Sequence, residues 1–335
     1  MGRLKVLYIG GTGVISSACV RRSLELGHEV HVFNRGRRPA DFPGEVRQIQ
    51  GDRKDPASFA KAFGKETYDI VADFLCYDGG DAKSLLSVFD GRCAQLIVIS
   101  STSAYQKPPS SWVVTESTPL SNPFWKYSQG KIEVEKVCMD AFHERGTPVT
   151  IVRPAYTYGL SMIPGPTGSS WNVAHRILAG KPLVCPAQVV WTLTYNEDFA
   201  VGFCGLMGHP AAIGQAFHIA GDEAHTWEVI LRTVGDSLGR KVETVNVTAE
   251  FIARFDAELA ATWWGDKANS VVFDSSKIRR LVPAFQPRIR LHEGVRRCLA
   301  WCDAHPEFKT VDEKREALLD RIVEGWRRAL DAAGR

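Results

Sequence analysis

The sequence predicts an α/β fold: a Rossmann-type, doubly wound parallel sheet with a smaller C-terminal α/β substrate-binding region. Short apolar runs alternate with helical patterns in the first half, as in successive βαβ units. A glycine-rich turn joins the first apolar run to the first helical pattern. The 335 residues, 44% of them hydrophobic, can bury one large or two unequal cores. We predict a nucleotide-binding domain over 1–155, to which 195–220 return, a mainly substrate-binding region over 156–310, and a C-terminal helix over 311–335.

The first half is predicted to supply the parallel strands and their crossover helices. Each strand candidate is a short apolar run closed by glycine or polar residues, and each helix candidate has apolar residues at helical spacing. The strands are expected at 4–9, 29–33, 46–50, 70–74, 96–100 and 149–152. The helices are expected at 14–26, 56–63, 82–89 and 127–142.

The second half is less regular. Its segment 160–170 is rich in Gly, Pro and Ser, which predicts a flexible loop beside the substrate. The tail 312–333 carries one apolar stripe, which predicts a helix that docks on the body or on a neighbouring subunit. Further strands are expected at 189–193 and 216–219, and further helices at 197–208, 226–238, 249–259 and 291–304.

Charge and cysteine usage exclude several classes of protein. The net charge of +3 is far from that of a dedicated nucleic-acid binder, so nucleic acid is an improbable partner. The eight cysteines contain no Cys-x-x-Cys pair, so we expect neither a disulfide framework nor a metal site. We expect no signal peptide, and the sequence contains no apolar run of membrane-spanning length. These features predict a cytoplasmic protein that binds a small-molecule substrate and no membrane.

The glycine turn follows the first strand and opens the first helix, the context in which it binds a dinucleotide. Glycine allows the tight turn and the close approach of a pyrophosphate, and the helix N-terminus supplies amide donors. Ser16 occupies the place of the third glycine, where a small residue still allows the helix to pack on the strand. The cofactor contacts predicted here are Gly10, Thr12, Gly13, Val14 and Ile15.

The form of the cofactor depends on the end of the second strand. The run from Asn34 and Arg35 to Arg38 has no acidic residue to hold the ribose 2′-hydroxyl of NAD. An arginine at this place can accommodate the 2′-phosphate of NADP, so NADP is favoured while NAD stays open. After the third strand, Asp52 and Arg53 are predicted to reach the adenosine end.

A hydroxyl cluster and a tyrosine–lysine pair predict the redox centre. Ser100, Ser101 and Thr102 follow a buried strand, and ligands of parallel sheets bind beyond the carboxyl ends of strands. Tyr127 and Lys131 are four residues apart on a helix, so both side chains can point into one site. We expect the ammonium group, and the positive ring of an oxidised cofactor, to lower the tyrosine pKa. Tyr127 would then act as a base in alcohol oxidation and as an acid in ketone reduction.

These motifs, in this order, resemble those of the extended short-chain dehydrogenases within the NAD-dependent epimerase/dehydratase family. The resemblance covers about residues 4–302 and includes the Arg153-Pro154 passage, the segment from Trp191 to Ala200 and the Asp274-Ser275-Ser276-Lys277 segment. It implies that Ser101 assists Tyr127, that Lys131 supports Tyr127 and holds the nicotinamide ribose, and that the enzyme forms a homodimer. Thr102 takes a place that is acidic in dehydratases, which argues against that branch. It also implies that Pro154 and Tyr156 line the nicotinamide side, and that Thr102, Tyr156, Trp191 and Asn196 contact the substrate.

Three functions follow as hypotheses. The first is NAD(P)-dependent epimerisation of a nucleotide-linked sugar or nucleoside through a transient ketone, with Tyr127 as the base. The second is an NADP(H)-dependent reductase or dehydrogenase of a small carbonyl or sugar substrate, which the Arg35 run favours. The third is an RNA-binding protein on the same scaffold, against which the modest charge and the intact Ser101, Tyr127 and Lys131 set argue.

Overall fold

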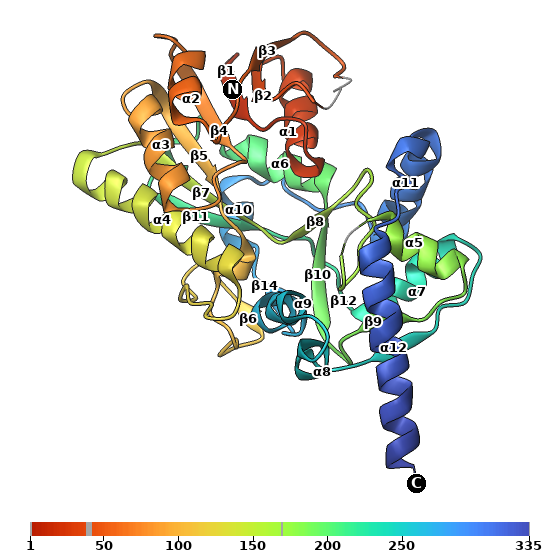
Figure 1. Cartoon of the computed structure of the whole chain (residues 1–335). Coiled ribbons are helices and arrows are strands. Elements are labelled where there is room, and N and C mark those ends of the chain that lie inside the picture. Colours follow the sequence, from red (N-terminus) through yellow and green to blue (C-terminus); the bar gives the residue numbers. More distant parts are fainter. Residues whose placement is uncertain (1, 38–41, 169, 335) are drawn as a thin grey trace.

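The computed structural model describes residues 2–37, 42–168 and 170–334. Arg38 of the basic run and Ser169 of the 160–170 segment therefore lie outside the described residues. Figure 1 shows a large sheet flanked by helices, with the later part of the chain packed below its carboxyl edge and a long C-terminal helix at one side.

The large sheet confirms the predicted fold class. Its seven strands are all parallel, and the register aligns the end of each strand with the end of its neighbour; Ile9 pairs with Asp73, and Asp73 with Val98. Ligand-binding loops are therefore brought together along one edge. The strand order is β11 (Gln215–Ile219), β7 (Val149–Pro154), β5 (Cys93–Ile99), β4 (Tyr68–Asp73), β1 (Lys5–Ile9), β2 (Glu29–Asn34) and β3 (Val46–Gln50).

Helices cover both faces of this sheet because its strands are apolar on both sides. Along β1, Val6 and Tyr8 belong to one buried cluster, and Leu7 and Ile9 to the cluster on the opposite face. One face is covered by α1 (Val14–Glu25), α6 (Asn196–Leu206) and α10 (Ser276–Leu281), and the other by α2 (Pro56–Ala62), α3 (Gly79–Phe89) and α4 (Lys126–Arg145).

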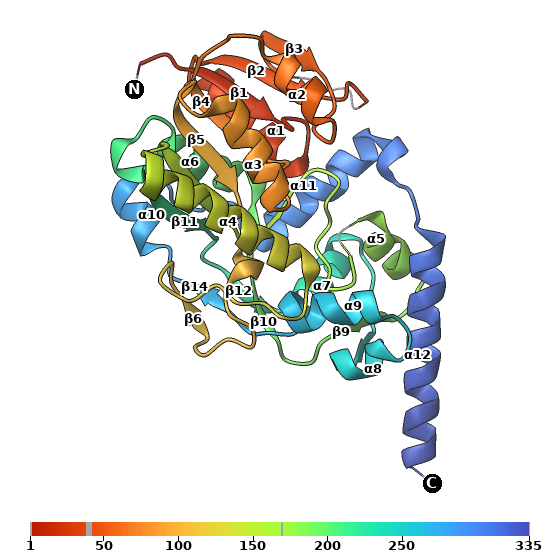
Figure 2. The ribbon, with the colours of Figure 1, turned by 60° about the vertical axis from the view of Figure 1, so that its left-hand side comes forward.

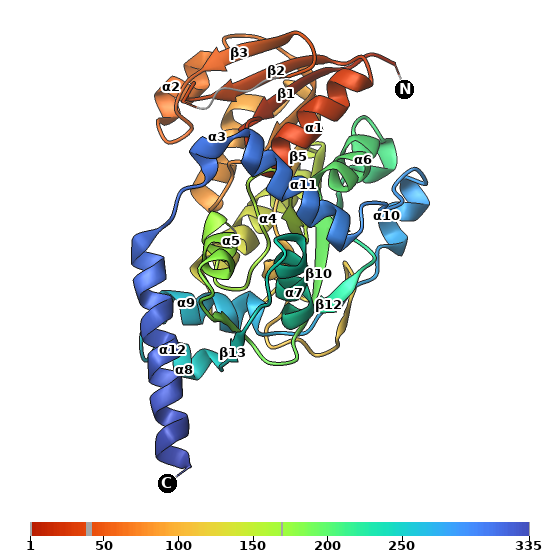
Figure 3. The same ribbon diagram turned by 90° about the vertical axis from the view of Figure 1, so that its right-hand side faces the viewer.

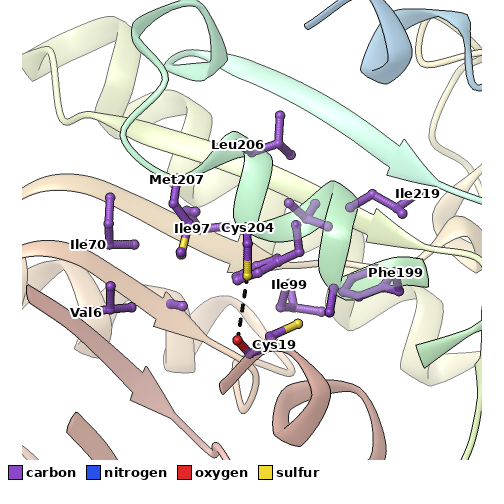
Figure 4. Packing of buried hydrophobic residues seen from close by; sticks show 14 of the residues in the cluster. Val6, Cys19, Ile70, Ile97, Ile99, Phe199, Cys204, Leu206, Met207 and Ile219 are labelled. Carbon is purple, nitrogen blue, oxygen red and sulfur yellow. Dashed lines mark hydrogen bonds between the residues drawn. The ribbon is translucent and has the colours of Figure 1, made fainter. Parts of the chain in front are cut away.

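The packing between α1 and α6 is mostly apolar and close. The Cys204 thiol of α6 lies 3.6 Å from the carbonyl oxygen of Cys19 on α1 (Figure 4). Figure 4 also shows aliphatic side chains of the sheet, such as Ile97 and Ile99, packed against this helix pair. Both thiols are free and buried, as a small hydrophobic residue would be. Through this contact, α6, which lies late in the chain, packs on the predicted nucleotide-binding domain.

The C-terminal region is built from small sheets and short helices. A three-stranded sheet pairs β12 (Ala224–Thr226) with β10 (Val190–Tyr195), and β10 with β8 (Tyr156–Tyr158). Two-stranded pairs join β9 (Leu183–Cys185) to β13 (Thr244–Asn246), and β6 (Val113–Val114) to β14 (Val272–Phe273). The helices are α5 (Trp171–Leu178), α7 (Trp227–Ser237), α8 (Ala249–Ala253), α9 (Ala257–Thr262) and α11 (Leu291–Ala304), and a π-helical turn spans Trp263–Lys267.

One prediction for this region was wrong. The single helix expected over 249–259 is divided into α8 and α9, because the Asp256 carboxylate accepts a hydrogen bond from the Leu259 amide at 2.6 Å and caps a new helix. The described residues of the 160–170 segment form a loop, as predicted, and its flexibility stays a prediction. Positions 163–167 are buried, and the Pro166 carbonyl accepts a hydrogen bond from the Trp263 indole at 2.9 Å.

The C-terminal helix α12 (Glu313–Ala333) docks through its first half and then projects away from the body (Figure 3). Leu319, Ile322 and Val323 are buried, whereas Leu330 is exposed. None of the helices in the described part of the chain has the length and apolar character needed to cross a membrane.

Candidate active site

A cavity of about 1000 Å³ lies at the carboxyl ends of the parallel strands. Its wall is formed by the loops after β1, β2, β3, β4 and β5, by the start of α4 and by parts of the C-terminal region. Its volume is at the upper end of the range usual for ligand sites. All of the predicted site residues except Asn196 line it.

The glycine turn fits a pyrophosphate. Gly10 has φ +89°, a conformation that L side chains rarely adopt, and a Cβ on Gly11 would lie 2.8 Å from the Val32 side chain. Ser16, in place of the third glycine, donates to the Gly10 carbonyl at 2.5 Å and accepts from the Gly13 amide at 2.9 Å. The Ser16 hydroxyl therefore stabilises the turn by linking its first and last glycines. The first amides of α1 have no acceptor in their own helix and face this cavity.

The adenosine end of the cavity is polar and basic. Arg35 and Arg37 line it, and the Asn34 side chain accepts from the Gly36 amide at 2.7 Å, which fixes the turn that presents both arginines. Asp52 lines the same end and accepts from the Lys54 amide at 2.9 Å. The described residues from Asn34, the end of β2, to Arg37 include no acidic side chain that would repel a phosphate.

Arg53, predicted to reach the adenosine end, is held by contacts within the protein. Its guanidinium lies 4.2 Å from the centroid of the Phe59 ring and donates to the Asp73 carboxylate at 3.3 Å and to the Asp81 carbonyl at 2.6 Å. The side chain is buried and lines the cavity wall. Its chief role in this structure is to join the loop after β3 to β4 and α3.

Tyr127 lies in the first turn of α4 and faces Ser101 at the end of β5. Burial raises the pKa of the tyrosine, and interaction with the Ser101 hydroxyl opposes that rise. Ser101 also shares a hydrogen bond of 2.9 Å with Ser103, which accepts from Ser128 at 2.8 Å. Thr102 lines the cavity beside them. Desolvation is the largest effect on the Tyr127 pKa in this structure, and the expected lowering by Lys131 and an oxidised cofactor stays a prediction.

Lys131 is buried one helical turn after Tyr127. Its ammonium group donates to the carbonyl oxygens of Cys76 at 2.6 Å and Ile99 at 2.8 Å, and it lies 5.6 Å from the centroid of the Tyr127 ring. Burial lowers the pKa of Lys131 to about 8. The two carbonyl oxygens fix the ammonium group at the ends of β4 and β5, below the tyrosine.

Ser100 belongs to a buried ionic network that the sequence did not reveal. Its hydroxyl donates to Glu135 of α4 at 2.5 Å, and Glu135 forms an ion pair with Arg153 of β7 at 2.6 Å. Arg153 also donates to the Tyr105 hydroxyl at 3.0 Å, which is hydrogen-bonded to His218 at 3.0 Å. His218 bonds the Asp274 carbonyl oxygen at 2.8 Å, so it is the satisfied core histidine that an apolar strand predicts.

Pro154, predicted on the nicotinamide side, and Tyr156 and Trp191, predicted to contact the substrate, line the cavity, but Asn196 does not. The Asn196 amide donates to the Val14 carbonyl at 2.9 Å and is buried behind the glycine turn. The prediction that Asn196 contacts substrate is therefore not supported, because packing of α6 on α1 turns its side chain toward the first helix.

Several lining residues were missed by sequence reasoning. Trp125 precedes the active helix, Tyr77 follows β4, and Asp266 and Lys267 come from the π-helical turn. One signal was available for Tyr77: Gly130 lies in the Tyr127 helix, and a Cβ there would lie 2.4 Å from the Tyr77 carbonyl oxygen. A glycine inside a helix often marks such a close approach.

Comparison with known proteins gives the family. The model of the NAD-dependent epimerase/dehydratase family matches residues 6–87 and 82–220. The 2′-dehydrokanamycin reductase of Streptomyces kanamyceticus is 30% identical over 291 residues, which cover 85% of this chain and 81% of the reductase. The chain belongs to the NAD-dependent epimerase/dehydratase family. It is an NAD(P)-dependent enzyme of the short-chain dehydrogenase type.

More distant members of the family, and proteins of the same fold, have diverse functions. The chloroplast stem-loop binding protein of 41 kDa b from Arabidopsis thaliana is 26% identical over 251 residues, covering 70% of this chain and 63% of that protein. The structure of UDP-glucose 4-epimerase from Bifidobacterium longum, solved with NAD⁺ and UDP, has a TM-score of 0.71 at 16% identity and covers 90% of this chain and 98% of that one. The latter match shows the fold alone.

Proposed function

We propose that this family member is an NADP(H)-dependent reductase or dehydrogenase that interconverts a hydroxyl and a ketone on a ring carbon of a polyhydroxylated small molecule. One cavity has Ser101, Tyr127 and Lys131 at one end and Arg35 with Arg37 at the other, and this arrangement carries the proposal. The arginine pair suits a 2′-phosphate. The identity to a reductase over 85% of the chain supports the same choice.

The residues of the chain would share the chemistry as follows. The bound nicotinamide would supply or accept the hydride. Tyr127 would donate its phenolic proton to the ketone oxygen during reduction and take a proton back during oxidation. The Ser101 hydroxyl would donate a hydrogen bond to the same oxygen, and the Lys131 ammonium would stabilise the phenolate that forms. Pro154 and Tyr156 would bound the nicotinamide side, and Thr102 and Trp191 the substrate side.

Epimerisation of a nucleotide-linked sugar or nucleoside is the second candidate. Membership of the epimerase/dehydratase family favours it, and the cavity of about 1000 Å³ is also lined by Trp191, Asp266 and Lys267. Thr102 supplies no carboxylate for water elimination, so dehydration is not proposed.

Mass spectrometry of the nucleotide released from the purified, denatured enzyme would distinguish the two candidates. A reductase exchanges its cofactor at each turnover, so we expect little retained nucleotide and saturable binding of added NADPH. Stoichiometric retained NAD⁺ would instead support the internal redox cycle of an epimerase. Absence of both retention and binding would overturn both proposals, and RNA binding would then be the hypothesis to measure.

Replacing the proposed acid–base group tests the chemistry directly. We expect Tyr127→Phe to lower kcat by roughly 10²–10⁴-fold, the usual contribution of a positioned acid or base. The affinity for NADPH, measured by fluorescence titration, should change little. Tyr195→Phe is a matched control, because it removes a buried tyrosine hydroxyl that does not line the cavity. Full activity of Tyr127→Phe would show that another group transfers the proton.

A further inference from the structure

We propose that Asp266 and Lys267 form a substrate-recognition pair that binds two neighbouring hydroxyl groups of an uncharged ring. This inference rests on the proposed function, because it assigns a substrate class to the same cavity. The two residues belong to the π-helical turn Trp263–Lys267, which lies more than 130 residues beyond Tyr127 in the chain.

The turn is fixed by hydrogen bonds to three other segments. The Asn122 amide donates to the Gly265 carbonyl at 2.7 Å, the Trp227 indole donates to the Lys267 carbonyl at 2.9 Å, and the Trp263 indole donates to the Pro166 carbonyl at 2.9 Å. A Cβ on Gly265 would lie 2.6 Å from the Trp125 Cβ, so only glycine allows this approach. Single π-helical turns are frequent at functional sites. Here the anchored turn presents two adjacent charged side chains to the cavity.

The charges themselves are enclosed. The side chains of Asp266 and Lys267 are 11% and 15% exposed, form an ion pair with each other, and line the cavity wall. The ammonium group also lies 4.6 Å from the centroid of the Tyr156 ring and 4.9 Å from that of Trp191. Enclosing an ion pair costs solvation that apolar residues of similar size would not lose. The turn is held by its hydrogen bonds to Asn122, Trp227 and Pro166, and not by the ion pair. We therefore assign the two charged side chains to ligand binding.

The pair is close to the proposed reaction centre. Asp266 and Lys267 line the same cavity as Tyr127 and Ser101. A ring whose carbonyl carbon faces Tyr127 would therefore present its other substituents to Asp266 and Lys267. Tyr156 and Trp191, which flank the ammonium group, line the same cavity.

Donor and acceptor properties define the ligand. A carboxylate only accepts hydrogen bonds and an ammonium group only donates them, so side by side they match a diol, in which one hydroxyl donates and the next accepts. The pair has no net charge. An uncharged, polyhydroxylated ring fits better than an amino sugar or a sugar acid.

The test is a binding titration on enzyme saturated with NADP⁺. Methyl glucoside and myo-inositol serve as uncharged polyhydroxylated rings, glucosamine as the amine and glucuronate as the acid. We expect the uncharged rings to bind the wild type, and Asp266→Asn and Lys267→Gln each to weaken that binding roughly 10- to 100-fold, as for lost hydrogen bonds to charged groups. The affinity for NADP⁺ should not change. Asp303→Asn, which breaks the surface ion pair with Lys309, is the matched control.

Unchanged binding of the uncharged rings by Asp266→Asn and Lys267→Gln would overturn the inference. Binding by the wild type of glucosamine or glucuronate alone, or of none of the four compounds, would overturn it as well. Failure of the proposed function has a different signature, because it is read from turnover by Tyr127→Phe and not from ring binding by variants of Asp266 and Lys267.

Discussion

Burial is the largest influence on the pKa values of Tyr127 and Lys131 in the proposed redox centre. From their spacing, Lys131 was expected to lower the pKa of Tyr127, yet desolvation raises the pKa of the phenol and lowers that of the ammonium group to about 8. The carbonyl oxygens of Cys76 and Ile99 accept hydrogen bonds from the Lys131 ammonium group. Tyr127 is therefore expected to be protonated in the free enzyme and able to act as an acid.

The pH dependence of ketone reduction follows from these two groups. Lys131 is protonated below about pH 8 and loses its charge above it, whereas Tyr127, whose pKa is raised, keeps its proton. We therefore expect kcat/KM for NADPH-dependent reduction to be level near neutral pH and to fall with an apparent pKa near 8, since this parameter reports groups of the free enzyme. A profile that rises from about pH 7 to about pH 10 would contradict the assignment of Lys131.

At the level of secondary-structure elements, one buried ion pair joins three parts of the nucleotide-binding domain. Glu135 of α4 binds Arg153 of β7 and accepts from Ser100 at the end of β5. The helix that carries Tyr127 is thereby fixed to the two strands that end beside it. Removing one member of a buried pair is costly because the other remains as an uncompensated charge.

Glu135→Gln should therefore destabilise the protein by about 3–5 kcal/mol. The substitution keeps the shape of the side chain but leaves the buried Arg153 guanidinium without its counter-charge. The free energy of unfolding would be measured by denaturant titration. Lys136→Gln is the matched control on the same helix, since its pair with Asp140 is exposed and should contribute nothing measurable. Equal stability of both variants would show that the Glu135–Arg153 pair does not hold α4.

At the scale of the whole molecule, the C-terminal helix is attached by a second buried cation. Arg176 of α5 is 1% exposed and binds Glu316 and Asp320 of α12 at 3.0 and 2.9 Å. Apolar residues of α12 complete the contact by packing with α8, α9 and Trp263 in one cluster. Trp263, the first residue of the turn that carries Asp266 and Lys267, belongs to the same cluster. The attachment of α12 therefore helps to hold this part of the cavity wall in place. The homodimer and the cytoplasmic location stay predictions.

Glu316→Gln should loosen this attachment. We expect a loss of about 3 kcal/mol, the lower end of the range for breaking a buried pair, because Asp320 still faces Arg176. Hydrogen exchange should rise over residues 313–323 more than over β1, and the melting temperature should fall. Glu324→Gln, on the exposed side of α12, is the control that should change neither. Unaltered exchange in Glu316→Gln would mean that the apolar contacts alone attach the helix.

Local patterns in the sequence determined the parallel sheet and its crossover helices, and the ordered Gly10, Tyr127 and Lys131 motifs indicated where a dinucleotide and its chemistry belong. These features are readable because each depends on neighbours within a few residues and on the rule that parallel strands end at one edge. Only the tertiary structure showed that Asn196 faces the first helix, that Glu135 and Arg153 meet under Ser100, and that Asp266 and Lys267 reach the cavity from a distant turn. Those contacts, like the burial that sets the two pKa values, join segments far apart in the chain, and local periodicity contains no information about which distant surfaces meet.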